Sequence, residues 1–227
     1  MNLPIVFLGP SLKLEKAKNI INADFRPPAK KGDFIKLSLF SDTRKVVLID
    51  GVFLQDYPPT PIEVFQVIRK TNFKVYGASS IGALRAVELE KFGMAGIGKI
   101  FEFYKKEIIN SDDEIAVTFD SNYNLLSEAM IDIRYNIFLA WKRQIIDKET
   151  KQIMIKLAKS IYFPFRSYDN IIDKSLDMYS LHKKSILNFK DYISNNRISL
   201  KELDALRALT FISSLQEKKQ MNNINIL

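Results

Sequence analysis

Short apolar runs alternate with helical patterns along the first half of the chain. Ile5–Leu8, Val46–Gly51 and Phe73–Tyr76 are compact apolar runs, each closed by or next to a glycine, which is typical of buried strands. Between and after these runs apolar residues recur at helical spacing, which predicts helices at 12–21, 61–70, 81–91 and 97–109. Strands of this length alternating with helices favour a small parallel sheet with right-handed crossovers.

Two helix starts are marked by residue type. Thr60, Pro61 and Glu63 form a capping box with proline at the first helical position, so we expect a helix to begin at residue 61. Ser11 is expected to cap the helix that follows the first strand.

The second half of the chain lacks the residues that break helices. No glycine follows Gly98, and Pro164 is the only proline after residue 61. After one further strand at 115–119, the pattern predicts helices at 125–147, 150–161, 168–195 in pieces, and 199–216. We therefore predict an α/β fold: a small parallel sheet with flanking helices in residues 1–124, and a helical part in 125–227. A single continuous domain also fits the pattern.

The net charge of +8 is placed unevenly. Residues 1–140 carry +1, and residues 141–227 carry +7. A basic region attracts nucleic acid, an acidic peptide or an acidic protein face; the alternative, which we favour, is a lysine-rich solvated helical surface. Zinc-finger and RNP patterns are absent, so we do not expect a nucleic-acid partner.

Several kinds of chemistry are excluded by composition. The chain has no cysteine, which rules out disulfides, thiolate metal sites, a cysteine nucleophile and a persulfide on this chain. His182 is the single histidine, so one subunit cannot form a multi-histidine metal site, and we expect no metal. No apolar run is long enough to span a bilayer, and the first residues lack the basic lead of a signal peptide. We expect a cytoplasmic protein without a membrane partner.

Polar residues follow three of the predicted strands. These strand ends are Gly9-Pro10-Ser11, Asp50-Gly51 and Gly77-Ala78-Ser79-Ser80. Ligands of open α/β sheets bind beyond the carboxyl ends of the strands, where the following helices also begin. If the three strands are neighbours, Ser11, Asp50, Ser79 and Ser80 face one crevice.

The third strand end resembles a nucleophile elbow. Ala78–Gly82 fits the pattern G-x-S-x-G with alanine at its first position, between a strand and a helix. Ser80 is then the candidate nucleophile and Asp50 its base, while Ser79 supplies an oxyanion or capping bond. A full triad would require His182. The alternative is an ordinary helix start at which the serines only cap the helix or bind a phosphate.

Anion binding is the second chemistry that this region suggests. Gly77 and Gly82 have the spacing of a phosphate-binding loop, but Ala83-Leu84 replaces the Lys-Ser/Thr that such a loop requires. Arg26 lies in a rigid basic loop that suits a phosphate or carboxylate, or is simply a surface loop. The candidate ligand- or anion-binding residues are Ser11, Arg26, Gly77, Gly82 and Arg85.

Taken together, these motifs resemble those of the TfuA-like proteins. The matching segments follow one another in order within residues 6–136: Val6–Leu12, Ala23–Asp33, Ile49–Phe53, Gly77–Leu89, Phe92–Gly98, Asp112–Val117 and Leu126–Met130. The helical remainder carries no matching motif. The resemblance supplies no established catalytic residues, and it places Arg26, Asp50, Ser79, Ser80 and Arg85 within the matching motifs.

The resemblance implies a role beside a YcaO enzyme. YcaO proteins use ATP and Mg²⁺ to phosphorylate a backbone amide oxygen, and a TfuA-like partner is associated with the version in which sulfide attacks and a thioamide results. The implied partners are the YcaO protein, a ribosomally made precursor peptide or substrate protein, and a sulfur-carrier protein. No cofactor is expected on this chain itself.

Two mechanisms fit this role. In one, the protein is an accessory subunit that activates YcaO or delivers sulfide to it. In the other, it is a serine hydrolase-like enzyme that uses Ser80 to release sulfide from the thiocarboxylated C-terminus of the carrier protein, a reaction that is an acyl transfer.

Overall fold

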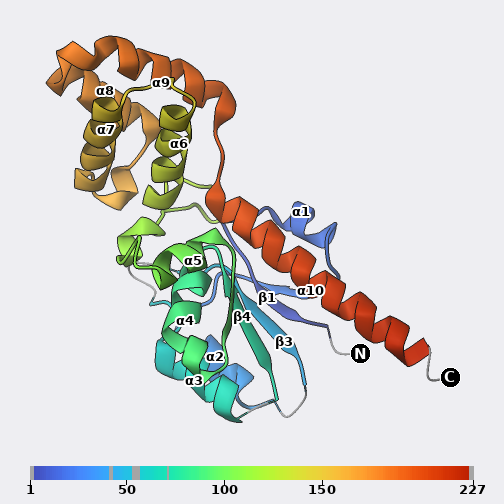
Figure 1. Ribbon diagram of the computed structural model, residues 1–227. Helices are drawn as coiled ribbons and strands as arrows, with labels where there is room; N and C mark the ends of the chain where they lie inside the picture. The colour runs from blue at the N-terminus through green and yellow to red at the C-terminus, as the bar shows by residue number, and fades with distance from the viewer. Residues whose placement is uncertain (1–2, 41–42, 53–56, 71, 225–227) are drawn as a thin grey trace. The chain divides into compact units, whose positions relative to one another are not determined.

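The computed structural model describes residues 3–40, 43–52, 57–70 and 72–224, with side chains of the last helix described as far as residue 217. These residues form two compact units. Residues 1–110 together with 201–227 make the first, called here the sheet unit, and residues 111–200 make the second, the helical unit. Figure 1 shows the elements of both.

The sheet unit is built on five parallel strands. They are β1 (Ile5–Phe7), β2 (Asp24–Arg26), β3 (Lys45–Leu48), β4 (Lys74–Ala78) and β5 (Ala95–Ile97). Their order is β2-β1-β3-β4-β5, and all four pairings are parallel. This is a doubly wound order that reverses direction between β1 and β3, the position at which such sheets bind ligands. The predicted fold class is confirmed.

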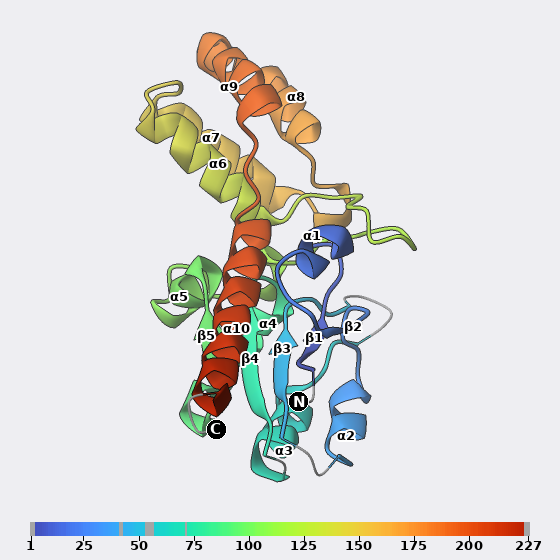
Figure 2. The ribbon, with the colours of Figure 1, turned by 90° about the vertical axis from the view of Figure 1, so that its right-hand side faces the viewer.

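Helices cover both faces of this sheet. They are α1 (Leu14–Lys18), α2 (Asp33–Leu37), α3 (Pro61–Lys70), α4 (Ile81–Leu89), α5 (Lys99–Lys105) and α10 (Leu200–Ile224), with a short 3-10 turn at Glu90–Phe92. Ala205, Leu209 and Ile212 of α10 pack with Val47 and Ala78 of the sheet, and Figure 2 shows α10 running across this face. On the opposite face the Phe34 ring of α2 stacks on Phe7.

Two local predictions in the sheet unit have clear outcomes, and two strands were missed. The capping box is confirmed, because the Thr60 and Glu63 side chains each bond the other residue's amide and the helix begins at Pro61. The predicted Ser11 cap is wrong: α1 begins at Leu14, and the Ser11 hydroxyl bonds another residue. Strands β2 and β5 were not predicted, since three residues with mixed polarity carry no strand pattern.

The helical unit contains four helices around one apolar core. They are α6 (Met130–Lys142), α7 (Lys148–Ser160), α8 (Tyr168–Met178) and α9 (Lys183–Asn196). One 3-10 turn, Asp112–Glu114, precedes α6, and two others lie between α7 and α8 (Phe163–Phe165) and between α8 and α9 (Ser180–His182). Ile133, Ile137, Met154, Ile171 and Phe189 are among the buried residues of this core. The helices expected here are confirmed, with shorter bounds for the first of them.

The strand expected at 115–119 does not form. Ile115, Ala116 and Val117 are buried apolar residues, which explains the strand-like pattern. Their segment makes a local loop instead, because the Thr118 amide donates to the Ser127 hydroxyl and the Leu126 amide donates to the Thr118 carbonyl.

The last predicted helix, 199–216, is α10. The sequence grouped it with the helical part of the chain, whereas in the structure residues 201–227 belong to the sheet unit. Asp204 of α10 also accepts hydrogen bonds from the amides of Lys99 (2.9 Å) and Ile100 (2.7 Å) and so caps α5. The sheet unit is therefore completed by the end of the chain.

Candidate functional site

The carboxyl edge of the sheet brings the predicted turns together. Strands β1, β3 and β4 are consecutive neighbours in the sheet. The turns that follow them, Gly9-Pro10-Ser11, Asp50-Gly51 and Ser79-Ser80, therefore lie along one edge. This is the arrangement on which the prediction of a shared crevice depended.

Asp50 is the polar centre of the β1 and β3 ends. Its side chain is buried and accepts hydrogen bonds from the Gly9 amide (2.9 Å), the Ser11 amide (3.1 Å) and the Ser11 hydroxyl (2.6 Å). A buried carboxylate requires such donors, because burial without hydrogen bonds is costly. Asp50 therefore holds the loop after β1 against the end of β3, at the point where the strand order reverses.

The turn after β4 differs, because its buried polar side chain has no hydrogen bonds of this kind. Ser79 has a φ of 65°, a left-handed conformation that costs non-glycine residues about 1–2 kcal/mol. Its side chain is fully buried, and its hydroxyl has no hydrogen-bond partner in the described part of the chain. Ser80 precedes α4 at φ −92° and ψ −128°, and its side chain makes no capping bond.

Two glycines allow this turn to pack tightly. A Cβ on Gly82 would lie 1.8 Å from the Leu48 carbonyl oxygen, and one on Gly77 would lie 2.1 Å from the Gly82 carbonyl oxygen. The start of α4 thus rests directly on the ends of β3 and β4. The role of both glycines in the structure is close packing between backbone segments.

Two backbone amides at the start of α4 lack a hydrogen-bond partner in the described part of the chain. The Gly82 amide donates to the Ile49 carbonyl, and the Ala83 amide donates to the Ser80 carbonyl. Within the described residues, no hydrogen bond is found from the amides of Ser80 and Ile81. Such amides at a helix start attract an anion or a developing oxyanion.

The two candidate arginines have structural partners. Arg26 bonds Asp24 on the same edge strand at 2.8 Å. Arg85 is buried, donates to the Pro59 carbonyl (2.8 Å) and pairs with Glu88 (2.7 Å), so it ties α4 to the segment before α3. An anion at either guanidinium would compete with these contacts.

Hydrogen bonds link Asp50 to one of the predicted serines, Ser11. Asp50 bonds Ser11, and no hydrogen bond between Asp50 and either Ser79 or Ser80 occurs among the described residues. His182 belongs to the helical unit, where its ring lies 3.4 Å from the Thr150 hydroxyl and 3.7 Å from Glu149. The described residues contain no group of side chains suited to holding a metal ion.

Sequence reasoning missed the special position of Ser79. The strained residue of a nucleophile elbow carries the nucleophile, and in this structure the strained backbone belongs to Ser79. The spacing Gly77-x-Ser79 was a usable signal. In that frame Ile81 stands at the position of the last glycine of G-x-S-x-G.

Fold and site together define a class: a doubly wound parallel α/β protein with a serine turn at the carboxyl edge of its sheet. A family model described as TfuA-like protein matches residues 50–167, about half of the chain. The chain belongs to the TfuA-like family. The match begins at Asp50, includes the Ser79-Ser80 turn and extends into the helical unit.

No curated protein matches the chain. Among the described residues, no helix combines the length and the apolar character that crossing a membrane requires.

Proposed function

We propose that this protein is the accessory partner of a YcaO enzyme in ATP-dependent thioamide formation on a ribosomally made peptide or protein. It activates YcaO, supplies it with sulfide, or does both. The observation that carries the proposal is membership of the TfuA-like family, through a match that includes the Asp50 and Ser79 turns.

Two features of the sequence indicate which steps the YcaO partner would perform: the missing phosphate-binding residues and the absence of cysteine. The turn between β4 and α4 lacks the Lys-Ser/Thr of a phosphate-binding loop, so ATP and Mg²⁺ are assigned to YcaO. With no cysteine in the sequence, sulfur cannot pass through this chain as a persulfide. Sulfide must then arrive free or be released from a carrier.

Reconstitution tests the accessory role. The substrate peptide should gain one sulfur in place of one oxygen only when YcaO, ATP, a limiting sulfide source and this protein are all present, as measured by mass spectrometry. Omission of this protein should leave the peptide unmodified at the same low sulfide concentration. Complete conversion by YcaO alone under those conditions would show that thioamide formation does not require this protein.

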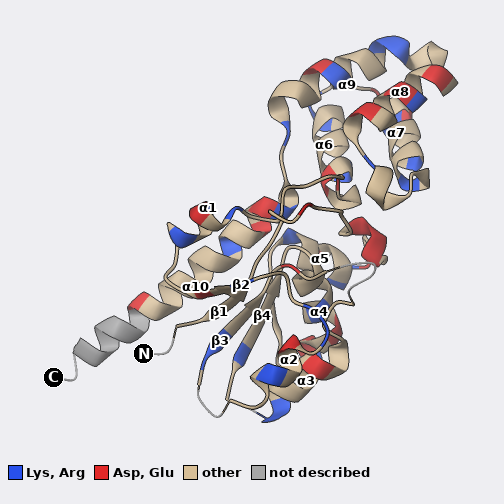
Figure 3. Ribbon diagram, turned by 180° about the vertical axis from the view of Figure 1, so that it is seen from behind, with Lys and Arg blue, Asp and Glu red and all other residues tan. Residues whose placement is uncertain are grey.

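The basic residues of 141–227, a segment that carries +7, are proposed to contact an acidic face of YcaO or an acidic leader peptide. Lys and Arg stand out on α7 and α9 in Figure 3, interspersed with acidic residues. Lys156, Lys159, Lys184 and Lys190 are exposed. Replacing these four by glutamine should weaken binding, and binding of the wild type should fall as salt rises, because salt screens exposed charges. Salt-independent binding would indicate an apolar interface instead.

A second candidate function is hydrolysis of a thiocarboxylate, favoured by the turn after β4. A serine hydroxyl attacks the thiocarboxylate carbon, the C–S bond breaks, and sulfide leaves with the hydroxyl proton. Water then cleaves the acyl-serine ester to give the carboxylate and to regenerate the hydroxyl. The sum is thiocarboxylate plus water giving carboxylate plus hydrogen sulfide.

The geometry favours Ser79 over Ser80 as the attacking group. Ser79 has the strained conformation and the unpartnered hydroxyl, and the amides of Ser80 and Ile81 lie beside it as oxyanion donors. The roles assigned from sequence to Ser80 and Asp50 remain a proposal, in which Asp50 must give up its Ser11 contact to act as base.

A further inference from the structure

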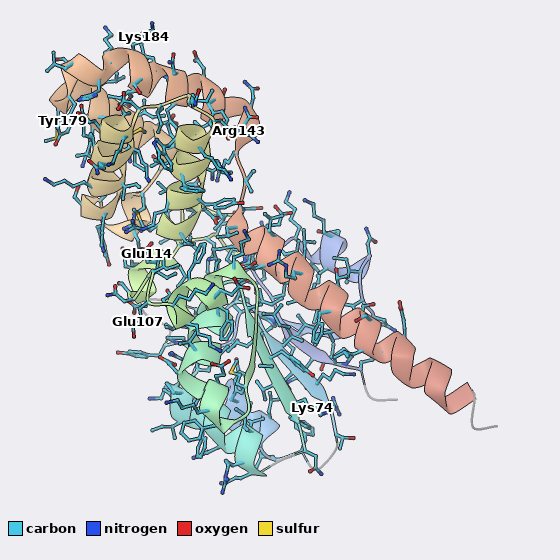
Figure 4. All side chains as sticks on the ribbon, viewed as in Figure 1. Lys74, Glu107, Glu114, Arg143, Tyr179 and Lys184 are labelled. Atoms are coloured by element: carbon cyan, nitrogen blue, oxygen red, sulfur yellow. The ribbon has the colours of Figure 1, made fainter. Side chains whose placement is uncertain are left out.

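An open cavity of about 540 Å³ lies within the helical unit. One wall is the end of α6 and the turn after it, and the other is the 3-10 turn before α9 and the first residues of that helix. The lining residues include Trp141, Ile145, Asp147, Leu181 and Lys184. All of them fall in residues 111–200, which the structure describes without a gap. Figure 4 labels Lys184 near the start of α9.

Hydrogen bonds hold the two walls together. The Asp147 amide donates to the Ser185 hydroxyl (3.3 Å), and the Asn188 side-chain amide donates to the Ile145 carbonyl (3.5 Å). Asp147 also caps α7, because its carboxylate accepts from the Thr150 amide and hydroxyl. The cavity is therefore shaped before a partner binds, and a preformed site loses less conformational entropy on binding.

The cavity offers an apolar contact to a partner. Leu181 is 97% exposed, and Trp141 and Ile145 are only partly buried. Lys151 lies over the Trp141 ring at 4.0 Å from its centre, which covers one face of the indole and fixes its position. An apolar side chain that enters the cavity removes surface of these residues from water, which is favourable in proportion to the area buried.

The charge around the cavity is positive. Segments 141–151 and 181–188 carry six Lys or Arg residues and two acids, Asp147 and Glu149. Asp147 is engaged in the α7 cap, and Glu149 lies 3.7 Å from His182. The first two residues of α9 are lysines, and its first turn contains no acid. Cations are unfavourable at the positive end of the helix dipole, so an anionic partner would stabilise this end of α9.

The size of the cavity suits a short segment better than a folded surface. A stable interface between folded proteins takes about 20–30 residues from each partner, whereas ten residues line this cavity. A segment with one bulky apolar residue between carboxylates matches both the exposed leucine and the lysines beside it. A ribosomally made peptide presents such flexible segments, whereas a folded enzyme presents a broad face.

We propose that this cavity binds an acidic segment of the substrate peptide through one apolar residue. The apolar residue packs against Trp141 and Leu181, and the flanking carboxylates face Lys183 and Lys184. The choice of the substrate peptide as occupant rests on the function proposed above. The binding itself is a property of this chain and requires neither YcaO nor ATP.

Trp141 is the single tryptophan of the chain, so its fluorescence reports directly on the cavity. The probe is a synthetic peptide with one leucine among glutamates, titrated into the full chain without YcaO. Binding should change the Trp141 emission and should weaken as salt rises. Peptides in which serine replaces the leucine, or lysine replaces the glutamates, should bind about tenfold more weakly or worse.

Two variants test the apolar and the charged contact, each with a matched control. Leu181→Ser should weaken probe binding about tenfold, whereas Leu126→Ser, at another exposed leucine of the helical unit, should not. Lys184→Glu should also weaken it, whereas Lys174→Glu, the same charge change at an exposed lysine outside the cavity, should not. Because Leu181 is almost fully exposed, its replacement should leave the fold intact.

Reconstitution tests the substrate peptide as the occupant. Leu181→Ser should raise the KM for that peptide, and an unchanged KM would overturn this assignment. The proposal is also overturned if the acidic probe does not bind, if the basic probe binds equally well, or if Leu181→Ser and Leu126→Ser bind alike. A change in Trp141 emission with YcaO and not with the peptide would overturn it too. Failure of the proposed function is distinguishable, because YcaO would then form the thioamide without this protein while the probe still bound.

Discussion

Two polar side chains lie buried at the carboxyl edge of the same sheet, and their surroundings differ. The Asp50 carboxylate accepts three hydrogen bonds from the loop after β1. The Ser79 hydroxyl, equally buried, finds no partner in the described part of the chain and sits on a left-handed backbone. Buried polar groups are nearly always paired, so an unpaired one in a strained turn requires an explanation other than stability.

This comparison assigns the two residues different tasks. Asp50 holds the fold at the point where the strand order reverses, and its contacts leave it little freedom for chemistry. The Ser79 hydroxyl makes no hydrogen bond among the described residues, and we propose that it is retained for function. The following predictions test this division, from the largest expected effect to the smallest.

Asp50→Ala should be strongly destabilising. It leaves two buried amides and one hydroxyl without an acceptor, and the loss should reach about 3–5 kcal/mol in the free energy of unfolding. Urea denaturation measures it. Asp50→Asn keeps the shape and its amide oxygen can still accept from both backbone amides, but its NH2 group then faces the Ser11 hydroxyl, so it should fall between wild type and alanine. A loss below about 1 kcal/mol for Asp50→Ala would contradict the structural role.

Gly82→Ala should destabilise the protein by about 1–3 kcal/mol, because its Cβ would press on the Leu48 carbonyl oxygen, a backbone atom that cannot rotate away. The substitution should also displace the Ser79 turn, so activity should fall along with stability. Thermal unfolding and the thioamidation assay measure the two effects. Full activity in this variant would show that the conformation of the Ser79 turn is not needed for activity.

Asp204 is a second buried residue of the sheet unit whose carboxyl group accepts backbone hydrogen bonds. Burial raises the pKa of Asp204 above its ordinary value, despite the amide donors of Ile100 and Lys99. A carboxyl group with a raised folded-state pKa binds more protons folded than unfolded, so its contribution to stability falls as pH rises from about 4 through the folded pKa. The stability of wild type relative to Asp204→Asn should therefore decrease over that window. A relative increase would contradict the direction of the pKa shift.

Ser79→Gly should stabilise the fold slightly, by about 1 kcal/mol or less, because glycine accepts positive φ without the steric cost and no hydrogen bond is lost. Glu107, labelled in Figure 4, is a matched control, since it is exposed and has a φ of 55°. Glu107→Gly should relieve similar strain away from the turn. Chemical denaturation that shows Ser79→Gly to be clearly less stable than wild type would contradict this account.

The sequence predicted those elements whose signals are local. The apolar run of β3 and the box of Thr60 and Glu63 specify their structure within a few residues. The three-residue strands β2 and β5 form because neighbouring strands offer hydrogen bonds, a condition that their own residues do not encode. The packing of α10 on the sheet is also long-range, since Ala205 and Leu209 fit a helix in either unit.

The sequence predicted which turns lie together at the carboxyl edge of the sheet. It did not predict the conformations and hydrogen bonds of the residues in those turns. Glycines and polar residues after the apolar runs indicated which turns lie together. The two serines differ in that Ser79 has a positive φ. Residue type does not predict this, because serine seldom adopts the left-handed conformation. The pairing of Asp50 with Ser11 likewise follows from how the β1 loop folds back, which no spacing rule specifies.

The most direct test of the central claim, that the Ser79 hydroxyl serves function, compares Ser79→Gly, Ser80→Ala and Glu107→Gly in YcaO reconstitution. Each is assayed with sulfide supplied on a thiocarboxylated carrier and with free sulfide in excess. The account predicts that Ser79→Gly, folded and bound to YcaO, loses product formation from the carrier and recovers it with free sulfide, while Glu107→Gly behaves as wild type. A Ser79→Gly protein as active as wild type with both sulfur sources would contradict the claim.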